Sequence, residues 1–205
     1  MIFNKKAGLR ELSLHLLDIA ENSVNAKAKN VRILVSEDSR TDRLRMEIVD
    51  DGVGMDAETA ARVTDPFVTS RTTRKVGLGL PFLKMAAEGC NGYLTVHSRK
   101  GTGTRVDVEF QRSHIDRMPL GDLTGTILSL VIGYPKVHWT FTYRGNDREF
   151  IFDDTTVKDE LDGIPLSEPT VIQFLREMIS EGIQANQPVD ETAFTTTSDH
   201  EQPTL

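Results

Sequence analysis

The order of helical and strand periodicities along the chain is the feature that most restricts its fold. Residues 10–25 carry apolar side chains at helical spacing, which predicts a helix with one buried face. Short β-branched or alternating runs predict strands, and two further segments predict helices. The predicted strands are 31–35, 44–49, 93–98 and 104–110, and the predicted helices after the first are 56–63 and 78–88. This order predicts a two-layer α/β sandwich, in which helices cover a mixed sheet.

A change in composition near residues 112–119 suggests a domain boundary. Residues 1–112 would then form the α/β domain, and residues 113–183 a small α+β accessory or interaction module. The predicted helices of this module are 120–132, 156–161 and 168–182, the last with Ser167 as its N-cap, and its hairpin strands are 137–143 and 148–153. From Gln184 onward there is almost nothing to bury, so residues 184–205 are predicted to be a disordered tail.

Composition and charge narrow the function classes. The 205 residues include 24 Lys and Arg against 31 Asp and Glu, a net charge of -7, which argues against a role on nucleic acid. No apolar run approaches the ~20 residues that span a bilayer, so no membrane association is expected. The single cysteine, Cys90, excludes a disulfide framework and multi-cysteine metal sites. Such cysteine usage is typical of a reducing compartment, and a cytoplasmic location is expected.

Asp18 and Asn22 on the first predicted helix are the first candidate site residues. They are four positions apart, so both side chains emerge on one helix face. A solvated helix face is one explanation of this pair. The other is a site in which Asn22 offers an amide oxygen to a hard cation such as Mg²⁺, while Asp18 holds or deprotonates a water molecule.

A second candidate is the segment Asp50-Asp51-Gly52-Val53-Gly54, which leaves a predicted strand. An Asp-Gly hairpin turn would explain it, but the next segment has helical rather than alternating periodicity. Two glycines separated by one residue also allow the backbone to approach a flat ligand. A carboxylate at the strand end can accept a hydrogen bond from an exocyclic amine, such as that of adenine.

The third candidate is a cationic, hydroxyl-rich run at 69–75, followed by Val76-Gly77-Leu78-Gly79-Leu80 at a helix start. Backbone N–H groups, the helix dipole and positive charge together suit phosphate binding. A basic loop in an acidic protein can also be merely solubilising. The chain has no G-x-x-x-x-G-K-[ST] sequence and no G-x-G-x-x-G at the start of a βαβ unit, which excludes a P-loop and a Rossmann site.

The histidines and the cysteine offer no clear site of their own. His15 lies one turn before Asp18 and could orient it, but a partly exposed helix histidine is the simpler expectation. The other four histidines, His97, His114, His138 and His200, lack the paired spacing of metal ligands. Cys90 follows a helix-ending glycine and is expected to be a small packed residue.

Taken in order, these elements resemble the ATP-binding domain of the GHKL superfamily, which DNA gyrase, the large heat-shock chaperones, sensor histidine kinases and mismatch-repair ATPases share. The order is an Asn-bearing helix, Asp-x-Gly-x-Gly, a break containing Phe67, a hydroxyl-rich segment, Gly-Leu-Gly-Leu, and Gly-Thr-Gly-Thr on the last hairpin. The resemblance covers residues 9–111. It is greatest to the sensor-kinase branch, whose phenylalanine box, lid and glycine boxes residues 65–110 follow, and it implies a Bergerat-type sheet.

The resemblance also implies roles for individual residues, with ATP and Mg²⁺ as the ligands. Asn22 would be the magnesium ligand and Asp50 the carboxylate that reads adenine. The other implied roles are Gly52 and Gly54 shaping the base pocket, Thr72, Thr73, Arg74 and Lys75 in a mobile lid, Gly77, Leu78 and Gly79 at the phosphates, and Thr104 supporting the pocket floor.

Three departures from the family pattern affect the expected activity. Asp18 stands where hydrolytic members have Glu, and its reach toward water is shorter by about 1.5 Å, so turnover is expected to be slow or absent. Lys75-Val76 replace a glycine that kinases often carry. No helical hairpin with a phospho-acceptor histidine precedes residue 9, so phosphorylation of the usual intramolecular kind is not expected.

Three functions are compatible with these features. The first is a regulatory ATPase or protein kinase that acts in trans on a partner protein. The second is a non-catalytic switch, in which nucleotide binding changes how residues 113–183 meet a partner. The third, a DNA-associated ATPase, is disfavoured by the net charge of -7. A homodimer is compatible with the first two.

Overall fold

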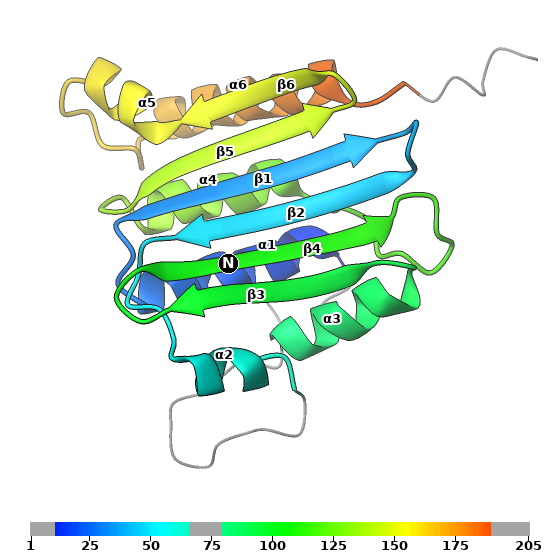
Figure 1. The fold of residues 1–205 in the computed structure, drawn as a ribbon. Coiled ribbons are helices and arrows are strands. Elements are labelled where there is room, and N and C mark those ends of the chain that lie inside the picture. Colours follow the sequence, from blue (N-terminus) through cyan, green and yellow to red (C-terminus); the bar gives the residue numbers. More distant parts are fainter. Residues whose placement is uncertain (1–10, 66–78, 190–205) are drawn as a thin grey trace, which may run out of the picture.

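A continuous six-stranded sheet forms the centre of the protein in a computed structural model, which describes residues 11–65 and 79–189 (Figure 1). The strands are β1 (Asn30–Asp38), β2 (Arg43–Asp50), β3 (Tyr93–Arg99), β4 (Gly103–Gln111), β5 (His138–Gly145) and β6 (Arg148–Asp153). Their order is β3-β4-β2-β1-β5-β6. All neighbouring strands are antiparallel except β1 and β5, which are parallel. The sheet is therefore mixed, as the sequence predicted.

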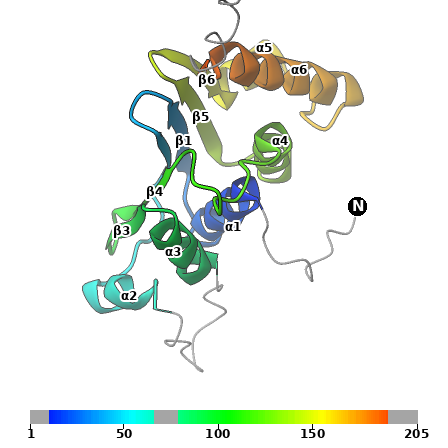
Figure 2. The same cartoon turned by 90° about the vertical axis from the view of Figure 1, so that its right-hand side faces the viewer.

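Helices cover one face of this sheet. The described helices are α1 (Leu12–Asn25), α2 (Ala57–Arg62), α3 (Gly79–Gly89), α4 (Leu123–Gly133), α5 (Asp154–Glu160) and α6 (Pro169–Asn186). Figure 2 shows α1, α3, α4 and α6 on the same side of the sheet, with α1 between α3 and α4. None of the helices in the described part of the chain combines the length and hydropathy that crossing a membrane requires. The prediction of a two-layer α/β sandwich is confirmed.

Alternation along the strands separates the buried face from the open one. In β2, Leu44, Met46 and Ile48 are buried toward the helices, because successive side chains of a strand point to opposite faces. Their neighbours on the open face are charged or half-buried. There Arg45 donates to Asp107 of β4 from Nε at 2.8 Å and from Nη2 at 2.6 Å. The core thus lies in a single layer between sheet and helices.

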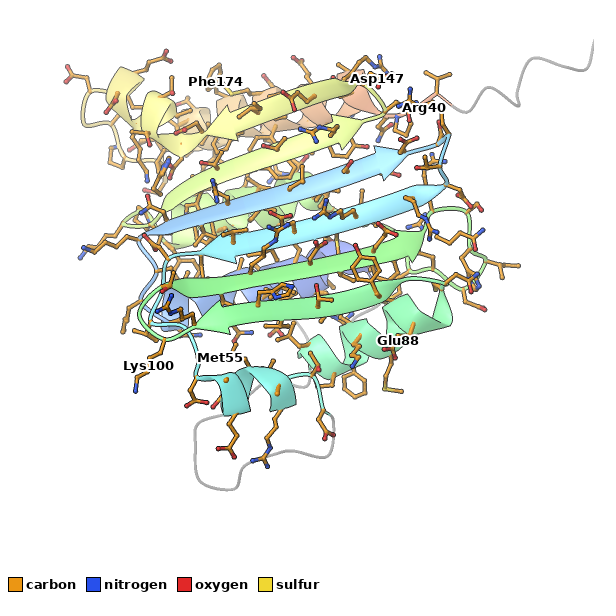
Figure 3. All side chains as sticks on the ribbon, in the orientation of Figure 1. Arg40, Met55, Glu88, Lys100, Asp147 and Phe174 are labelled. Carbon is orange, nitrogen blue, oxygen red and sulfur yellow. The ribbon has the colours of Figure 1, made fainter. Side chains whose placement is uncertain are left out.

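The two strands of residues 113–183 extend the sheet of residues 1–112. In the β1–β5 pair, Val31 lies opposite Trp139 and Ile33 opposite Phe141, so buried apolar side chains pair across the parallel junction. At the far end, Arg40 in the β1–β2 turn donates to Asp147 in the β5–β6 turn at 2.8 Å (Figure 3). The predicted hairpin is present, and it is hydrogen bonded into the same sheet.

Helix α6 differs from its prediction at both ends. Ser167 is not the N-cap; Glu168 holds that position without a side-chain capping bond, and the proline that follows supplies the fixed φ of a first helical turn. The helix also continues to Asn186, into the segment predicted to be disordered. It does so because Ile183 is buried in the core and because the Asn186 side chain donates to the backbone of the preceding turn at 2.7 Å.

Candidate functional site

A cavity of about 200 Å³ lies between α1, the start of α3, the end of β2 and the start of β4. Its apolar walls come from Ile19, Ala26, Met55, Val63, Leu80 and Val106, and its polar lining comes from Asn22, Ser23, Asp50 and Thr104. Met55 lies in the turn between β2 and α2 (Figure 3). Apolar walls with a few convergent polar groups are typical of small-molecule sites.

Asp50 is the buried carboxylate of this cavity, with 8% of its surface exposed. Oδ2 accepts a hydrogen bond from the Ser23 hydroxyl at 2.7 Å. Oδ1 accepts the backbone N–H groups of Gly52 at 2.9 Å and Thr104 at 3.3 Å. These three donors come from α1, the turn after β2 and the start of β4, so three elements fix the orientation of one carboxylate. Oδ2, with one such donor, has acceptor capacity left for a ligand.

Asp51, unlike Asp50, has a structural role in the turn after β2. Its carboxylate accepts the backbone N–H groups of Lys29 at 2.7 Å and Asn30 at 2.9 Å, and the Asn30 side-chain amide at 2.6 Å. Burial acts to raise the pKa of Asp51, but the hydrogen bonds from Asn30 and Lys29 outweigh it and hold the pKa below its ordinary value. Asp51 therefore ties the turn after β2 to the start of β1.

The two glycines of this turn are required by close backbone packing. A Cβ on Gly52 would lie 2.8 Å from the Ala26 carbonyl oxygen and 3.0 Å from Asp50 Oδ1. Gly54 has φ +62°, and a Cβ there would overlap the carbonyl of Arg99. Gly54 lines the cavity, whereas Gly52 packs against the end of α1 beside it.

Asn22 and Asp18 lie one turn apart on α1, as the spacing predicted. Asn22 is exposed and lines the same cavity as Asp50. Asp18 is half-buried, and its carboxylate oxygen occupies the space that a side chain on Gly79 would need. A carboxylate at the first residue of α3 is favourably placed with respect to the helix dipole. The structure thus brings Asp18, Asn22 and Asp50 to one end of the molecule.

Replacing Gly79 with Ala is expected to destabilise the chain by about 1–3 kcal/mol, because the new methyl group would overlap the Asp18 carboxylate. Urea unfolding measures this loss. Gly89 at the other end of α3 has open space where a Cβ would lie. Gly89→Ala should therefore be neutral or stabilising, by up to about 1 kcal/mol. Equal stability of Gly79→Ala and wild type would contradict the packing described here.

Thr104 closes the cavity from β4. Its backbone N–H reaches Asp50, and its hydroxyl lies 2.9 Å from the Ser98 hydroxyl. Ser98 also receives the backbone N–H of Met55 at 2.8 Å, which fixes that side of the cavity. Sequence reasoning did not assign Ser23 to the site. The available signal was its position on the same helical stripe as Leu12, Leu16 and Ile19, where a hydroxyl would be buried.

The remaining candidate residues lie outside the described part of the chain. They are Thr72, Thr73, Arg74, Lys75, Gly77 and Leu78. Their implied roles at the nucleotide phosphates stay predictions.

His15 is buried, and the expectation that it is partly exposed is wrong. Only 3% of its surface is exposed, and Nδ1 has no hydrogen-bond partner among residues 11–65 and 79–189. It shares the inner face of α1 with Leu12 and Leu16, so the helix turns it into the core rather than toward solvent. Burial lowers the pKa of His15 to about 4, because the charged imidazolium is disfavoured there.

This buried imidazole predicts that acid destabilises the fold. Above pH 6.5 His15 is neutral in both states; between pH 6.5 and 4 the unfolded chain binds a proton that the folded chain does not. The free energy of unfolding should therefore fall by up to about 3 kcal/mol as the pH decreases through this window. Urea unfolding at several pH values measures the slope. His15→Leu should flatten it and His97→Leu, a change at an exposed position, should not; equal slopes for wild type and His15→Leu would refute the assignment.

A second polar cluster lies at the start of β5. His138, Asp153 and Asp154 each place a possible ligand atom within 4.8 Å of the others. However, the Lys158 ammonium lies 2.5 Å from the fully buried Asp154 carboxylate. The positive charge that a buried carboxylate requires is therefore supplied by the chain itself. This cluster is an internal ion pair that joins β5 to α5.

Comparison with known proteins identifies the family. The protein family described as "Histidine kinase-, DNA gyrase B-, and HSP90-like ATPase" matches residues 7–114 of this chain. The sensor protein kinase FleS of Pseudomonas aeruginosa is 40% identical over 89 residues, which is 43% of this chain and 22% of that protein. The non-motile and phage-resistance protein of Caulobacter vibrioides is 31% identical over 121 residues, which is 55% of this chain and 14% of that protein.

These relatives are much longer than the present chain, which covers less than a quarter of the length of either. A crystal structure of the N-terminal domain of a DNA repair protein has the same fold, with a TM-score of 0.52 at 14% identity over 84% of this chain and 56% of that one. The family match spans the cavity and every described residue that lines it. The chain belongs to the family of histidine kinase-, DNA gyrase B- and HSP90-like ATPases, and residues 7–114 are an ATP-binding domain of the histidine-kinase-like type.

Proposed function

We propose that the cavity binds ATP with Mg²⁺, and that Asp50 recognises the adenine base. The observation that carries this proposal is the fixed Asp50 carboxylate, which lines a cavity with largely apolar walls and whose Oδ2 accepts only the Ser23 hydroxyl among the described residues. A flat purine suits such walls, and its exocyclic amine can donate to Oδ2. Guanine presents a carbonyl oxygen at the corresponding position, so acceptor would face acceptor. The site is therefore expected to select adenine nucleotides.

Asn22 would hold Mg²⁺ through its amide oxygen at the mouth of the cavity. Amide oxygens are among the hard ligands that this cation accepts, and the metal would neutralise charge on the phosphates. Asp18 lies one turn away at the start of α3 and is the candidate base. It would accept the proton of the group that attacks the γ-phosphorus, either water or a hydroxyl or imidazole of a partner protein. Breaking the β–γ linkage would leave ADP.

For the whole chain we propose a regulatory ATPase or protein kinase that acts in trans on a partner protein. Support comes from the relatives, which include a sensor protein kinase. A nucleotide-dependent switch without phosphoryl transfer is the second candidate. It is favoured by the contacts that residues beyond 114 make with α1, the helix that carries Asp18 and Asn22. Transfer of labelled phosphate from γ-labelled ATP to a partner would separate the two.

A thermal-shift titration tests nucleotide binding itself. Wild-type protein is titrated with ATP, ADP and GTP, each with and without Mg²⁺. ATP at a hundredfold excess over its dissociation constant should raise the free energy of unfolding by about 2.7 kcal/mol. GTP should have little effect, and Asn22→Ala should remove the Mg²⁺ dependence of the ATP response. Equal responses to ATP and GTP would contradict adenine recognition by Asp50.

A further inference from the structure

Helix α1 is capped by a segment that lies beyond the family match. The backbone N–H of Leu12 donates to the carbonyl of Pro119 at 3.0 Å, and that of Ser13 to the carbonyl of Leu120 at 2.9 Å. The first N–H groups of a helix have no partner within the helix. The N-cap residue, Glu11, makes no side-chain capping bond. The start of α1 is therefore completed by backbone that lies about a hundred residues further along the chain.

A second contact from the same segment reaches the other half of α1. Tyr134, the C-cap of α4, donates its hydroxyl to Glu21 Oε1 at 3.1 Å. Glu21 directly precedes Asn22. Burial and then the Glu21 carboxylate raise the pKa of Tyr134, which keeps the hydroxyl protonated as a donor. The Tyr134 carbonyl in turn accepts the Trp139 indole N–H at 3.3 Å, so Tyr134 is also tied to β5.

The linker that leads into this segment is itself fixed. Arg117 donates from Nε to the carbonyl of Arg112 at 2.6 Å and from Nη1 to that of Met118 at 2.8 Å. Arg112 pairs with Glu37 of β1 at 3.2 Å. The segment is therefore anchored to the sheet on one side and to α1 on the other, and a displacement of α4 would be transmitted to α1.

We infer that residues 119–134 form a brace that positions α1 for nucleotide binding, with Tyr134 as a positioning residue; this inference rests on the proposed function. Tyr134 holds the Glu21 carboxylate on the α4 side of α1. Without that hydroxyl, the carboxylate is released one residue from the magnesium ligand, where it repels the triphosphate. The helix also loses a contact that preorganises it. Coupling between two sites is reciprocal, so Mg²⁺-ATP binding should in turn stabilise the contacts between α1 and the brace. A change that displaces α4 should likewise alter the affinity for ATP.

Tyr134→Phe is the test, because it removes only the hydroxyl. Isothermal titration should give a dissociation constant for Mg²⁺-ATP about three- to tenfold weaker than that of wild type. Adenosine, which has no phosphates, should weaken by less than roughly twofold. Glu21→Gln in the Tyr134→Phe background should restore most of the Mg²⁺-ATP affinity, since it removes the released charge but does not remake the lost contact. A general loss of stability would instead weaken both ligands alike and would not be rescued; either result overturns the brace.

Tyr143→Phe is the matched control. Tyr143, like Tyr134, donates its hydroxyl to a glutamate, Glu37, at 2.7 Å, but it is fully buried and joins β5 to β1. It should change stability without changing the affinity for Mg²⁺-ATP. Trp139 is the only tryptophan of the chain, so its emission reports on the brace. Mg²⁺-ATP should alter this emission in wild type and less so in Tyr134→Phe.

The binding measurements distinguish a failure of the proposed function from a failure of the brace. If wild-type protein binds no Mg²⁺-ATP, the proposed function fails. If wild type binds it and Tyr134→Phe binds it equally well, the proposed function stands and the brace is refuted.

Discussion

Replacing Asp50 with Asn is expected to weaken ATP binding by about 30- to 150-fold, which corresponds to about 2–3 kcal/mol. Oδ1 of Asp50 accepts two backbone N–H groups, so the amide oxygen of Asn must take that position. The amide NH₂ then takes the place of Oδ2. There it would face the exocyclic amine of adenine, donor against donor. At a concentration that stabilises wild type by about 2.7 kcal/mol, the variant should gain less than about 1 kcal/mol.

Asp107→Asn provides the control for a general effect of removing a buried carboxylate. Asp107 is as buried as Asp50, with 8% of its surface exposed. It pairs with Arg45 on the open face of the sheet, away from the cavity. This variant should lose stability but keep the full response to ATP. An undiminished ATP response in Asp50→Asn would mean that the base binds elsewhere.

Replacing Lys158 with Met is expected to destabilise the fold by about 3–5 kcal/mol, a large part of the stability of a domain of this size. Asp154 is fully buried, and its carboxylate depends on the Lys158 ammonium at 2.5 Å. The Trp139 backbone N–H at 3.0 Å is a neutral donor and cannot balance the charge. Methionine keeps the apolar stem but removes the ammonium, which leaves the His138 ring nitrogen at 2.7 Å as the nearest ionisable partner of the buried carboxylate. Urea unfolding at neutral pH measures the loss.

Two comparisons make this result specific. Lys84→Met removes an ammonium from another i,i+4 pair, with Glu88, but that pair is exposed and its atoms lie 3.9 Å apart. It should cost less than about 0.5 kcal/mol. Asp154→Asn combined with Lys158→Met should recover part of the stability, because the buried charge is gone. If the two lysine variants were equally stable, the internal ion pair would have no structural role.

The helices and strands could be predicted from local periodicity, whereas the pairing of distant strands could not. The alternation in residues 137–143 identifies a strand, but not its partner. Its parallel pairing with β1 joins segments about a hundred residues apart and depends on apolar rows such as Val31 and Trp139 meeting across the junction. The continuation of α6 to Asn186 likewise depends on tertiary burial of Ile183, which composition does not reveal.

Part of the cavity lining could be predicted from the sequence. Asp50 at a strand end and Asn22 on the first helix could be placed together from the order of motifs, and they line one cavity. Their roles toward a nucleotide stay proposals. The contact of Ser23 with Asp50 was not predicted, and His15 was wrongly expected to be partly exposed, because both features depend on which way α1 faces. The Ser23 hydroxyl meets the Asp50 carboxylate across 27 residues of sequence, and the His15 imidazole is buried with no partner for Nδ1 in the described part of the chain.

A crystal structure grown with Mg²⁺ and a non-hydrolysable ATP analogue would test the central claim most directly. We expect the purine amine within about 3 Å of Asp50 Oδ2, and the magnesium ion at about 2.1 Å from the Asn22 amide oxygen. A nucleotide bound outside this cavity, or one whose phosphates point away from Asn22, would contradict the account.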